Sequence, residues 1–185
     1  MSLKIRSFTL KDASAVKEFT DRTIGLNYFT PPELVNFYHQ SFKDGLDCTL
    51  VLEDEAGQIR GIRLTFPHGN WHYGKGPRLS PDLWTVPQEK VAYFQSLFIE
   101  PSLTGKGWGK KLSLQSLELL KKVGAQAVVA HSWVESPHDS SGKYLRGLDF
   151  KFVKTYPLYW NKVDYTCPRC GKPCVCTAEE MILSL

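Results

Sequence analysis

The spacing of hydrophobic and polar residues predicts a chain that alternates between strands and helices. Residues 3–8 alternate between apolar and polar positions, as expected for a strand that buries one face. Two helices should follow, because a threonine precedes an acidic residue by three positions at Thr9 to Asp12 and again at Thr30 to Glu33. In this arrangement each side chain can satisfy free backbone groups at a helix start.

Further along the chain, apolar runs and glycine or proline breaks predict the remaining elements. We expect strands at 48–53, 59–66, 91–99, 126–133 and 152–160, a helix that ends near residue 123 and a short helix within 139–148. The run at 91–99 is dense in apolar residues, which is typical of a central strand. The strand, helix and strand between residues 91 and 133 form one right-handed crossover.

Composition narrows the class of protein. The 185 residues are 42% hydrophobic and 23% charged, which is ordinary for a globular protein. A net charge of +4 is too small to indicate nucleic-acid binding by itself. No apolar run is long enough to cross a bilayer, and no signal pattern opens the chain. We therefore expect a cytoplasmic protein.

A glycine-rich loop lies between the apolar strand at 91–99 and the following helix. A helix N-terminus presents free N–H groups and the positive end of its dipole, which together favour a phosphate group. Glycines allow the backbone to approach that anion closely, and lysines in and after the loop add positive charge. The loop comprises Thr104, Gly105, Lys106, Gly107, Trp108, Gly109 and Lys110.

Two familiar phosphate-binding loops do not fit this segment. A Walker A loop needs Ser or Thr after its Gly-Lys pair, but Gly107 follows Lys106. A dinucleotide fingerprint needs a third glycine where the chain has Lys110. A plain connecting turn remains an alternative, although it would not need this many glycines and lysines.

The loop instead resembles the signature of the GNAT acetyltransferases, Arg/Gln-x-x-Gly-x-Gly/Ala. Gly107 and Gly109 match this signature, whereas Thr104 replaces its first residue. The resemblance extends over residues 3–160 through the order of the elements. It implies an α/β (α+β) fold with a mixed, mostly antiparallel sheet, a splayed central strand pair and flanking helices.

The resemblance also implies the chemistry. The cosubstrate would be acetyl-CoA, with its pantetheine arm along Leu97, Phe98 and Ile99 and its phosphates on the glycine loop. A primary amine would attack the thioester directly in a ternary complex. The acceptor, whether a small molecule or a peptide, and the oligomeric state cannot be read from the sequence.

Candidates for proton transfer follow from the same resemblance. The family often has a tyrosine in a Tyr-x-x-x-Gly-Phe pattern, but here Asp149 replaces the glycine and Tyr144 lies one residue early. Tyr144 is the candidate acid for the coenzyme A thiolate, with a packing role as its alternative. Glu100 is the candidate base, with Glu135, His131 or a water chain as alternatives.

The segment at 68–90 is rich in glycine and proline and reads as irregular. Its aromatic and imidazole groups, which include His68, Trp71, His72 and Tyr73, suit either an acceptor pocket or a surface flap. The two histidines form no convincing metal pattern.

Four cysteines cluster near the C-terminus, at positions 167, 170, 174 and 176. Cys167, Cys170, Cys174 and Cys176 could supply a tetrahedral zinc site, with two disulfides or free thiols as alternatives. We expect an acetyltransferase domain at 1–160 and a cysteine-rich tail at 161–185. The rival hypothesis is a catalytically inactive acyl-CoA fold whose zinc knuckle binds protein or nucleic acid.

Overall fold

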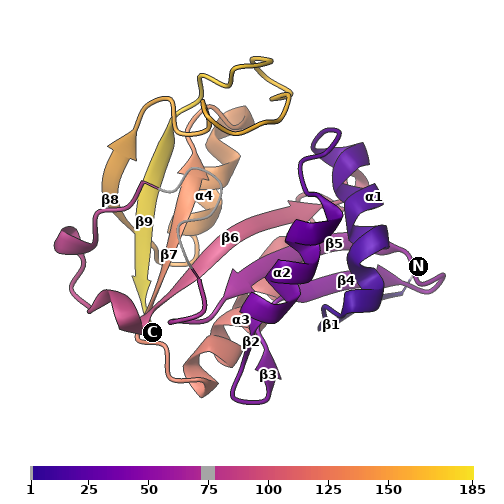
Figure 1. Cartoon of the computed structure of the whole chain (residues 1–185), viewed down its shortest axis with the longest axis horizontal. Helices are drawn as coiled ribbons and strands as arrows, with labels where there is room; N and C mark the ends of the chain where they lie inside the picture. The colour runs from indigo at the N-terminus through magenta and orange to yellow at the C-terminus, as the bar shows by residue number, and fades with distance from the viewer. Residues whose placement is uncertain (1, 72–77) are drawn as a thin grey trace.

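The computed structural model describes residues 2–71 and 78–185, which form a sheet with helices on both faces (Figure 1). The described helices are α1 (Ala13–Thr23), α2 (Pro31–Ser41), α3 (Trp108–Lys122) and α4 (Ser140–Arg146). The strands are β1 (Leu3–Ser7), β2 (Phe42–Lys43), β3 (Leu46–Asp47), β4 (Leu50–Asp54), β5 (Ile59–Phe66), β6 (Val91–Ile99), β7 (Ala127–Trp133), β8 (Lys151–Tyr156) and β9 (Ala178–Ser184).

Seven of these strands form one sheet in the order β1-β4-β5-β6-β7-β9-β8. Within it only β6 and β7 run parallel, and every other recorded neighbour pair is antiparallel. The short strands β2 and β3 form a separate hairpin. The predicted mixed, mostly antiparallel sheet with flanking helices is therefore confirmed.

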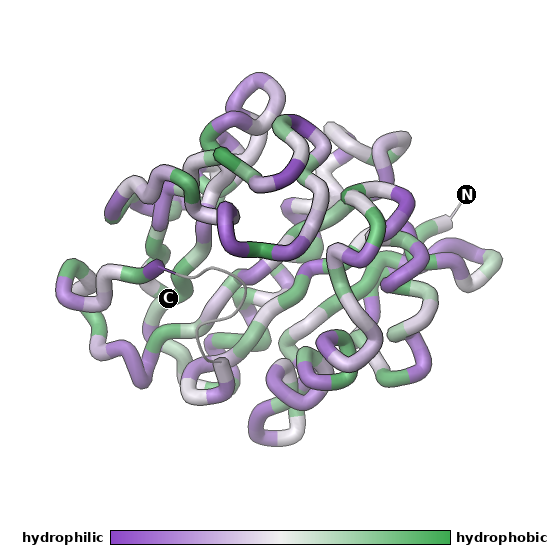
Figure 2. The backbone as a smooth tube through the Cα atoms, turned by 45° about the horizontal axis from the view of Figure 1, so that its top comes forward, coloured by the Kyte–Doolittle hydropathy of each residue, from purple (hydrophilic) through white to green (hydrophobic). Residues whose placement is uncertain are grey.

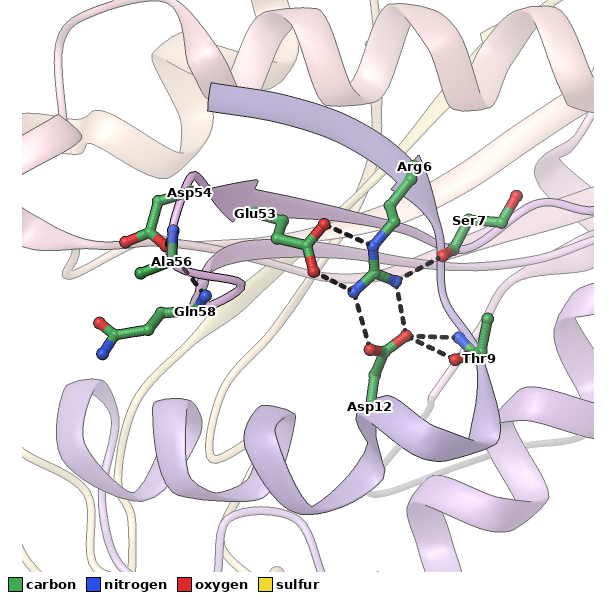
Figure 3. Close-up of polar contacts among 8 residues, drawn as sticks. All are labelled: Arg6, Ser7, Thr9, Asp12, Glu53, Asp54, Ala56 and Gln58. Carbon is green, nitrogen blue, oxygen red and sulfur yellow. Dashed lines mark hydrogen bonds and ion pairs between the residues drawn. The ribbon is translucent and has the colours of Figure 1, made fainter. Parts of the chain in front are cut away.

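The first predicted helix start is built as the sequence indicates. The N–H and hydroxyl of Thr9 both donate to the Asp12 carboxylate at 2.8 Å, although the first turn at Leu10–Asp12 is a 3₁₀ turn rather than α-helix. Arg6 donates two hydrogen bonds to Asp12 and two to Glu53 (Figure 3). This forked arginine ties the start of the helical segment to both β1 and β4.

The second helix start is also confirmed, but the end of the helix differs from the prediction. The N–H and hydroxyl of Thr30 donate to Glu33 at 2.8 and 2.7 Å. The apolar spacing of the sequence predicts a helix that ends at Gly45 with Phe42 on its buried face, but the helix ends at Ser41, and Phe42 lies in β2 and is 49% exposed. Gly45, with φ +80°, instead turns the chain between β2 and β3.

Alternate residues of the central strands supply two hydrophobic layers. Val91 and Tyr93 pack with the buried side chains of α1 and α2, whereas Ala92 and Phe94 pack with those of α3. Hydrophobic and hydrophilic stretches accordingly alternate over short distances along the tube in Figure 2. Each large side chain buried in this way contributes about 1.5–3 kcal/mol relative to exposure.

The parallel pair β6 and β7 separates halfway along its length. The two strands pair from Val91 with Ala127 to Phe94 with Ala130, and the recorded pairing then stops. Beyond that point β6 continues beside β5 and β7 continues beside β9. Gln95 is an extra residue in β6 next to this point. Leu64 of β5 pairs with Ser96, and the next residue, Thr65, pairs with Phe94, so the register shifts at Gln95. The predicted splay is confirmed.

The C-terminal strand β9 is an element that the sequence pattern did not predict. Residues 178–184 were assigned to the cysteine tail, but they lie between β7 and β8, and β8 ends at Tyr156 rather than at 160. The adjacent Glu179 and Glu180 break the hydrophobic pattern of this strand, and yet Glu180 is fully buried. Its carboxylate accepts hydrogen bonds from the Ser80 N–H, the Trp84 indole and the Tyr156 hydroxyl, which offset the cost of burial.

Candidate active site

A cleft of about 510 Å³ opens where β6 and β7 separate. Its lining includes Phe94 and Tyr144, which pack on the α3 and α4 side of the sheet. It also includes Tyr93, which packs on the α1 and α2 side, and its neighbour His131. The cleft therefore joins the two faces of the sheet between the splayed strands.

One wall of the cleft is the unpaired edge of β6. Predicted residues Leu97, Phe98 and Ile99 all line the cleft, and their recorded strand partners lie on β5 only. Backbone groups on the β7 side are thus available to an extended ligand. Gln95 lines the same wall, and its buried carboxamide oxygen accepts no hydrogen bond from any described residue. This orphaned acceptor suits an amide-bearing arm such as pantetheine.

The glycine loop lies at the end of this wall. Thr104 lines the cleft, and the following residues of the loop lie outside its lining. Gly107, with φ +81°, precedes α3, whose first hydrogen bond runs from the Lys111 N–H to the Gly107 carbonyl at 3.0 Å. The earlier N–H groups of the helix are therefore left for another partner. A Cβ on Gly105 or Gly107 would meet no atom within 4 Å, so an anion can approach.

The third glycine of the loop has a different role. A Cβ on Gly109 would lie 3.0 Å from the Leu97 Cδ2 atom, so this glycine lets α3 approach β6 closely. Lys106, Lys110 and Lys111 are all exposed, but the Lys111 ammonium lies 4.3 Å from the centre of the Trp108 ring. Lys106 and Lys110 have no such recorded contact among the described residues, so they are the lysines available beside the open end of the loop.

Tyr144 lies on the cleft beside a buried positive charge. The Arg63 guanidinium donates to the Ser113 hydroxyl and to the Tyr144 hydroxyl, both at 3.0 Å, and the two hydroxyls contact each other. Arg63 is 3% exposed, and the ion pairs recorded among the described residues do not include it. Asp149, which stands where the family pattern has glycine, has φ +67°, a conformation that glycine adopts easily.

His131 lies on the opposite face of the cleft and is neutral. Because the Arg78 carbonyl lies 3.1 Å from Nε2 and can only accept, Nε2 carries the proton. Nδ1 therefore accepts, with the Tyr159 hydroxyl at 3.2 Å and the Tyr93 hydroxyl at 3.5 Å. Burial lowers the pKa of His131 to about 4, against a smaller opposing effect of the Arg78 carbonyl.

The two acidic candidates do not line the cleft. The Glu100 carboxylate accepts from Arg22 at 2.8 Å and lies 3.6 Å from Arg60. Glu135 accepts the N–H of Thr177 with both oxygens and so fixes the chain just before β9. Both carboxylates thus have partners outside the cleft lining, whereas His131 lines it.

His68 and Trp71, the described residues of the irregular segment that suggested an acceptor pocket, pack elsewhere than on the cleft. Trp71 is buried, donates its indole N–H to the Val91 carbonyl at 2.8 Å and packs on the Tyr93 ring. His68 is buried too, and burial together with nearby lysines lowers its pKa. Neither residue lines the cleft. The interpretation of His72 and Tyr73 as pocket residues falls outside the described residues.

Comparison with known proteins identifies the fold. No protein-family model and no curated protein matches the sequence. The structure is similar to the ribosomal-protein-S18-alanine N-acetyltransferase from Escherichia coli, with TM-score 0.68 and 12% identity, covering 99% of this chain and 94% of that one. The chain has the fold of the GNAT N-acetyltransferases.

Two other solved structures show the same GNAT fold. A GCN5-related N-acetyltransferase from Kribbella flavida matches with TM-score 0.65 and 18% identity, covering 99% of this chain and 98% of that one. YncA from Salmonella typhimurium, solved with its cofactor acetyl-CoA, matches with TM-score 0.67 and 17% identity, covering 100% of this chain and 95% of that one. None of the helices described in our structure has the length and hydrophobicity needed to span a membrane.

This GNAT fold carries a cysteine cluster between β8 and β9. The four sulfurs of Cys167, Cys170, Cys174 and Cys176 lie within 4.8 Å of one another, with recorded contacts of 3.7, 3.8 and 3.9 Å. Tetrahedral Zn–S bonds of about 2.3 Å would place sulfurs about 3.8 Å apart. These separations are too long for disulfides and fit zinc. Cys48 is buried elsewhere, in the core beside α3.

Several residues of the GNAT cleft had no signal in the sequence. Arg63 and Ser113 are polar residues on elements that read as an ordinary strand and helix, and only the fold brings them to Tyr144. Tyr159 was expected within a last strand, but it follows β8 in a turn and reaches His131. A buried arginine position inside an apolar strand is the one clue that could have singled out Arg63.

Proposed function

We propose that this protein transfers an acetyl group from acetyl-CoA to a primary amine by direct attack in a ternary complex. The observation that carries the proposal is the splay of β6 and β7, which opens a cleft directly beside a helix N-terminus preceded by open, positive-φ glycines. The cleft suits a thin extended arm, and the helix N-terminus suits a pyrophosphate.

The cofactor is held mainly by backbone groups. The N–H groups at the start of α3 bind the phosphates, assisted by Lys106 and Lys110. The free edge of β6 from Gln95 to Ile99 pairs with the pantetheine amides, and one of its N–H groups polarises the thioester carbonyl. Thr104 in place of Arg or Gln leaves these backbone contacts in place.

The reaction needs one proton donor and one proton acceptor. The amine nitrogen attacks the thioester carbonyl carbon, the carbon–sulfur bond breaks, and the coenzyme A thiolate takes the hydroxyl proton of Tyr144. The buried guanidinium of Arg63 stabilises the negative charge that forms there. The amine loses its proton toward Nδ1 of His131, through the Tyr159 hydroxyl or water. We prefer His131 to Glu100 as base because His131 lines the cleft.

The four cysteines hold a structural zinc ion. The cluster of Cys167, Cys170, Cys174 and Cys176 supplies a complete tetrahedral set, so no coordination position is left for a substrate or water. Zinc therefore supplies folding energy to a segment too short to form a core.

The acceptor is a single amine rather than a polyamine. None of the described residues that line the cleft is Asp or Glu, so a second ammonium group would find no counter-charge there. The similar E. coli enzyme is named for an alanine of a ribosomal protein, which makes peptide N-termini the first acceptors to examine.

Acetyl-CoA turnover against a panel of amines tests the proposal. Coenzyme A thiol release should rise with one acceptor class, and mass spectrometry should find that acceptor heavier by one acetyl group. Binding of coenzyme A without turnover on peptides, polyamines, aminoglycosides and free lysine would favour the rival hypothesis of an inactive binding module.

A further inference from the structure

The cysteine segment forms part of the cleft rather than a distant appendage. We name residues 165–176 the knuckle, and three of its residues, Tyr165, Cys167 and Pro168, line the cleft. Figure 1 shows this gold segment at the same end of the molecule as the segment that joins α1 to α2. The knuckle therefore stands over the opening of the splayed strands.

The knuckle touches the segment that connects α1 and α2. The rings of Tyr28 and Tyr165 meet edge to face, with centroids 5.4 Å apart. A Cβ on Gly25 would lie 3.3 Å from the Thr166 carbonyl oxygen, so the two backbones also approach closely. Since Ile24 and Tyr28 line the cleft too, these two segments form one continuous wall, which we name the acceptor wall.

The position of the acceptor wall depends on the cysteines. The Tyr165 hydroxyl donates a hydrogen bond to the Cys174 sulfur at 3.5 Å. The side chain that meets Tyr28 is therefore also hydrogen-bonded to one of the four cysteines. Trp133 and Trp160 pack against the same cysteines and line the cleft. The sulfurs thus lie at the centre of a group of aromatic rings, and those rings form the surface that an acceptor meets.

The phosphate end of the cofactor site has its own support, although the Phe98 ring on β6 also meets the Tyr28 ring, with centroids 5.4 Å apart. Leu97, Ile99 and Trp108 pack with Leu103 and Leu112 in a separate hydrophobic cluster that contains no knuckle residue. Loss of order in the knuckle would therefore reach the acceptor wall through direct contacts, but it would not reach the start of α3 by the same route.

We propose that zinc in the knuckle positions the acceptor wall and so sets the affinity for the acceptor amine, without contributing to phosphate binding at the start of α3. The inference rests on the proposed function for the zinc ion and for naming the ligand of this wall as the acceptor. Zinc loss should raise the KM for the acceptor about tenfold or more and change the KM for acetyl-CoA by less than about twofold.

Hydrogen exchange tests the coupling without an identified acceptor. Full-length protein with bound zinc is compared with protein treated with a zinc chelator under reducing conditions. Amides of residues 24–30 should exchange at least about tenfold faster after chelation, whereas those of 105–111 should be unchanged. Protein purified without zinc, or faster exchange confined to 161–177, overturns the proposal.

A pair of variants separates the contact from the metal. Tyr165→Ala keeps all four thiols and should bind one zinc, yet should expose residues 24–30 to faster exchange. Tyr165→Phe keeps the ring and should leave exchange at 24–30 close to that of the unaltered protein. Equal exchange in both variants overturns the proposal. Calorimetry with coenzyme A on the same samples reports separately on the proposed function, because failure to bind it leaves the exchange result intact.

Discussion

The two ends of the cleft are built in different ways. At the cofactor end, the start of α3 and the free edge of β6 offer backbone groups, and the determining residues lie between Gln95 and Lys111. At the acceptor end, side chains form the surface, and they come from the α1–α2 segment, β6, β7 and the knuckle. The residues of the cofactor end are thus close together in the sequence, whereas those of the acceptor end are brought together only by folding.

This difference predicts how each end responds to change. Backbone ligands tolerate most side-chain substitutions but fail when a glycine is replaced, because the approach of the phosphate is blocked. The acceptor end, which is made of packed aromatic side chains, should instead change when a buried side chain is protonated or when the metal that holds its segments together is removed. Three substitutions test this comparison further.

The largest effect should come from the residue placed between the two ends. Tyr144→Phe removes the hydroxyl beside Arg63 and should lower kcat by about 10²–10⁴-fold, with little change in coenzyme A affinity. Steady-state kinetics with calorimetry checks this. Tyr38→Phe is the matched control, because Tyr38 packs on Phe8 away from the cleft. Unchanged turnover in Tyr144→Phe removes Tyr144 from the mechanism.

A smaller effect should appear in the pH dependence of the free energy of unfolding, through His131 at the acceptor end. Burial lowers the pKa of His131 from 6.5 to about 4, so between those values the unfolded chain binds more protons than the folded one. Stability is therefore fully present above about pH 6.5 and is lost as pH falls, by up to about 3 kcal/mol at pH 4.

Denaturant unfolding between pH 4 and 7.5 measures this loss. Glu180 acts in the opposite direction, because burial raises its pKa. The informative quantity is thus the difference between the unaltered protein and His131→Gln, which cannot titrate at this position. Parallel curves for the two proteins would show that His131 is not held neutral.

The smallest effect should come from Glu100, which lies off the cleft. Its ion pairs with Arg22 and Arg60 are partly exposed, so Glu100→Gln should cost no more than about 1 kcal/mol of stability. Turnover should stay within about twofold, as in the control Glu118→Gln on the exposed face of α3. A loss of kcat beyond tenfold in Glu100→Gln alone would restore Glu100 as the candidate base.

The same contrast explains what the sequence could predict. The glycine loop, both capping boxes and the apolar strand at 91–99 are local patterns, and the structure has each where the pattern placed it. Leu97, Phe98, Ile99 and Thr104 line the cleft for the same reason. The splay, by contrast, came from the family resemblance.

What the sequence could not predict depends on distant partners. Glu180 made β9 look unlike a strand, because its hydrogen-bond donors Ser80, Trp84 and Tyr156 lie far away in the chain. The knuckle read as a tail because nothing local shows that Tyr165 meets Tyr28. Contacts of this kind have no periodicity, so only the folded chain reveals them.

Calorimetric titration of coenzyme A tests the central claim, that the start of α3 binds its phosphates. The unaltered protein should bind with a micromolar Kd, about −8 kcal/mol, and Gly107→Glu should bind at least about 100-fold more weakly. Gly57→Glu is the matched control, because Gly57 has φ +77° against +81° for Gly107 and both face open space. Its affinity should match that of the unaltered protein. Unchanged affinity in Gly107→Glu would contradict the account.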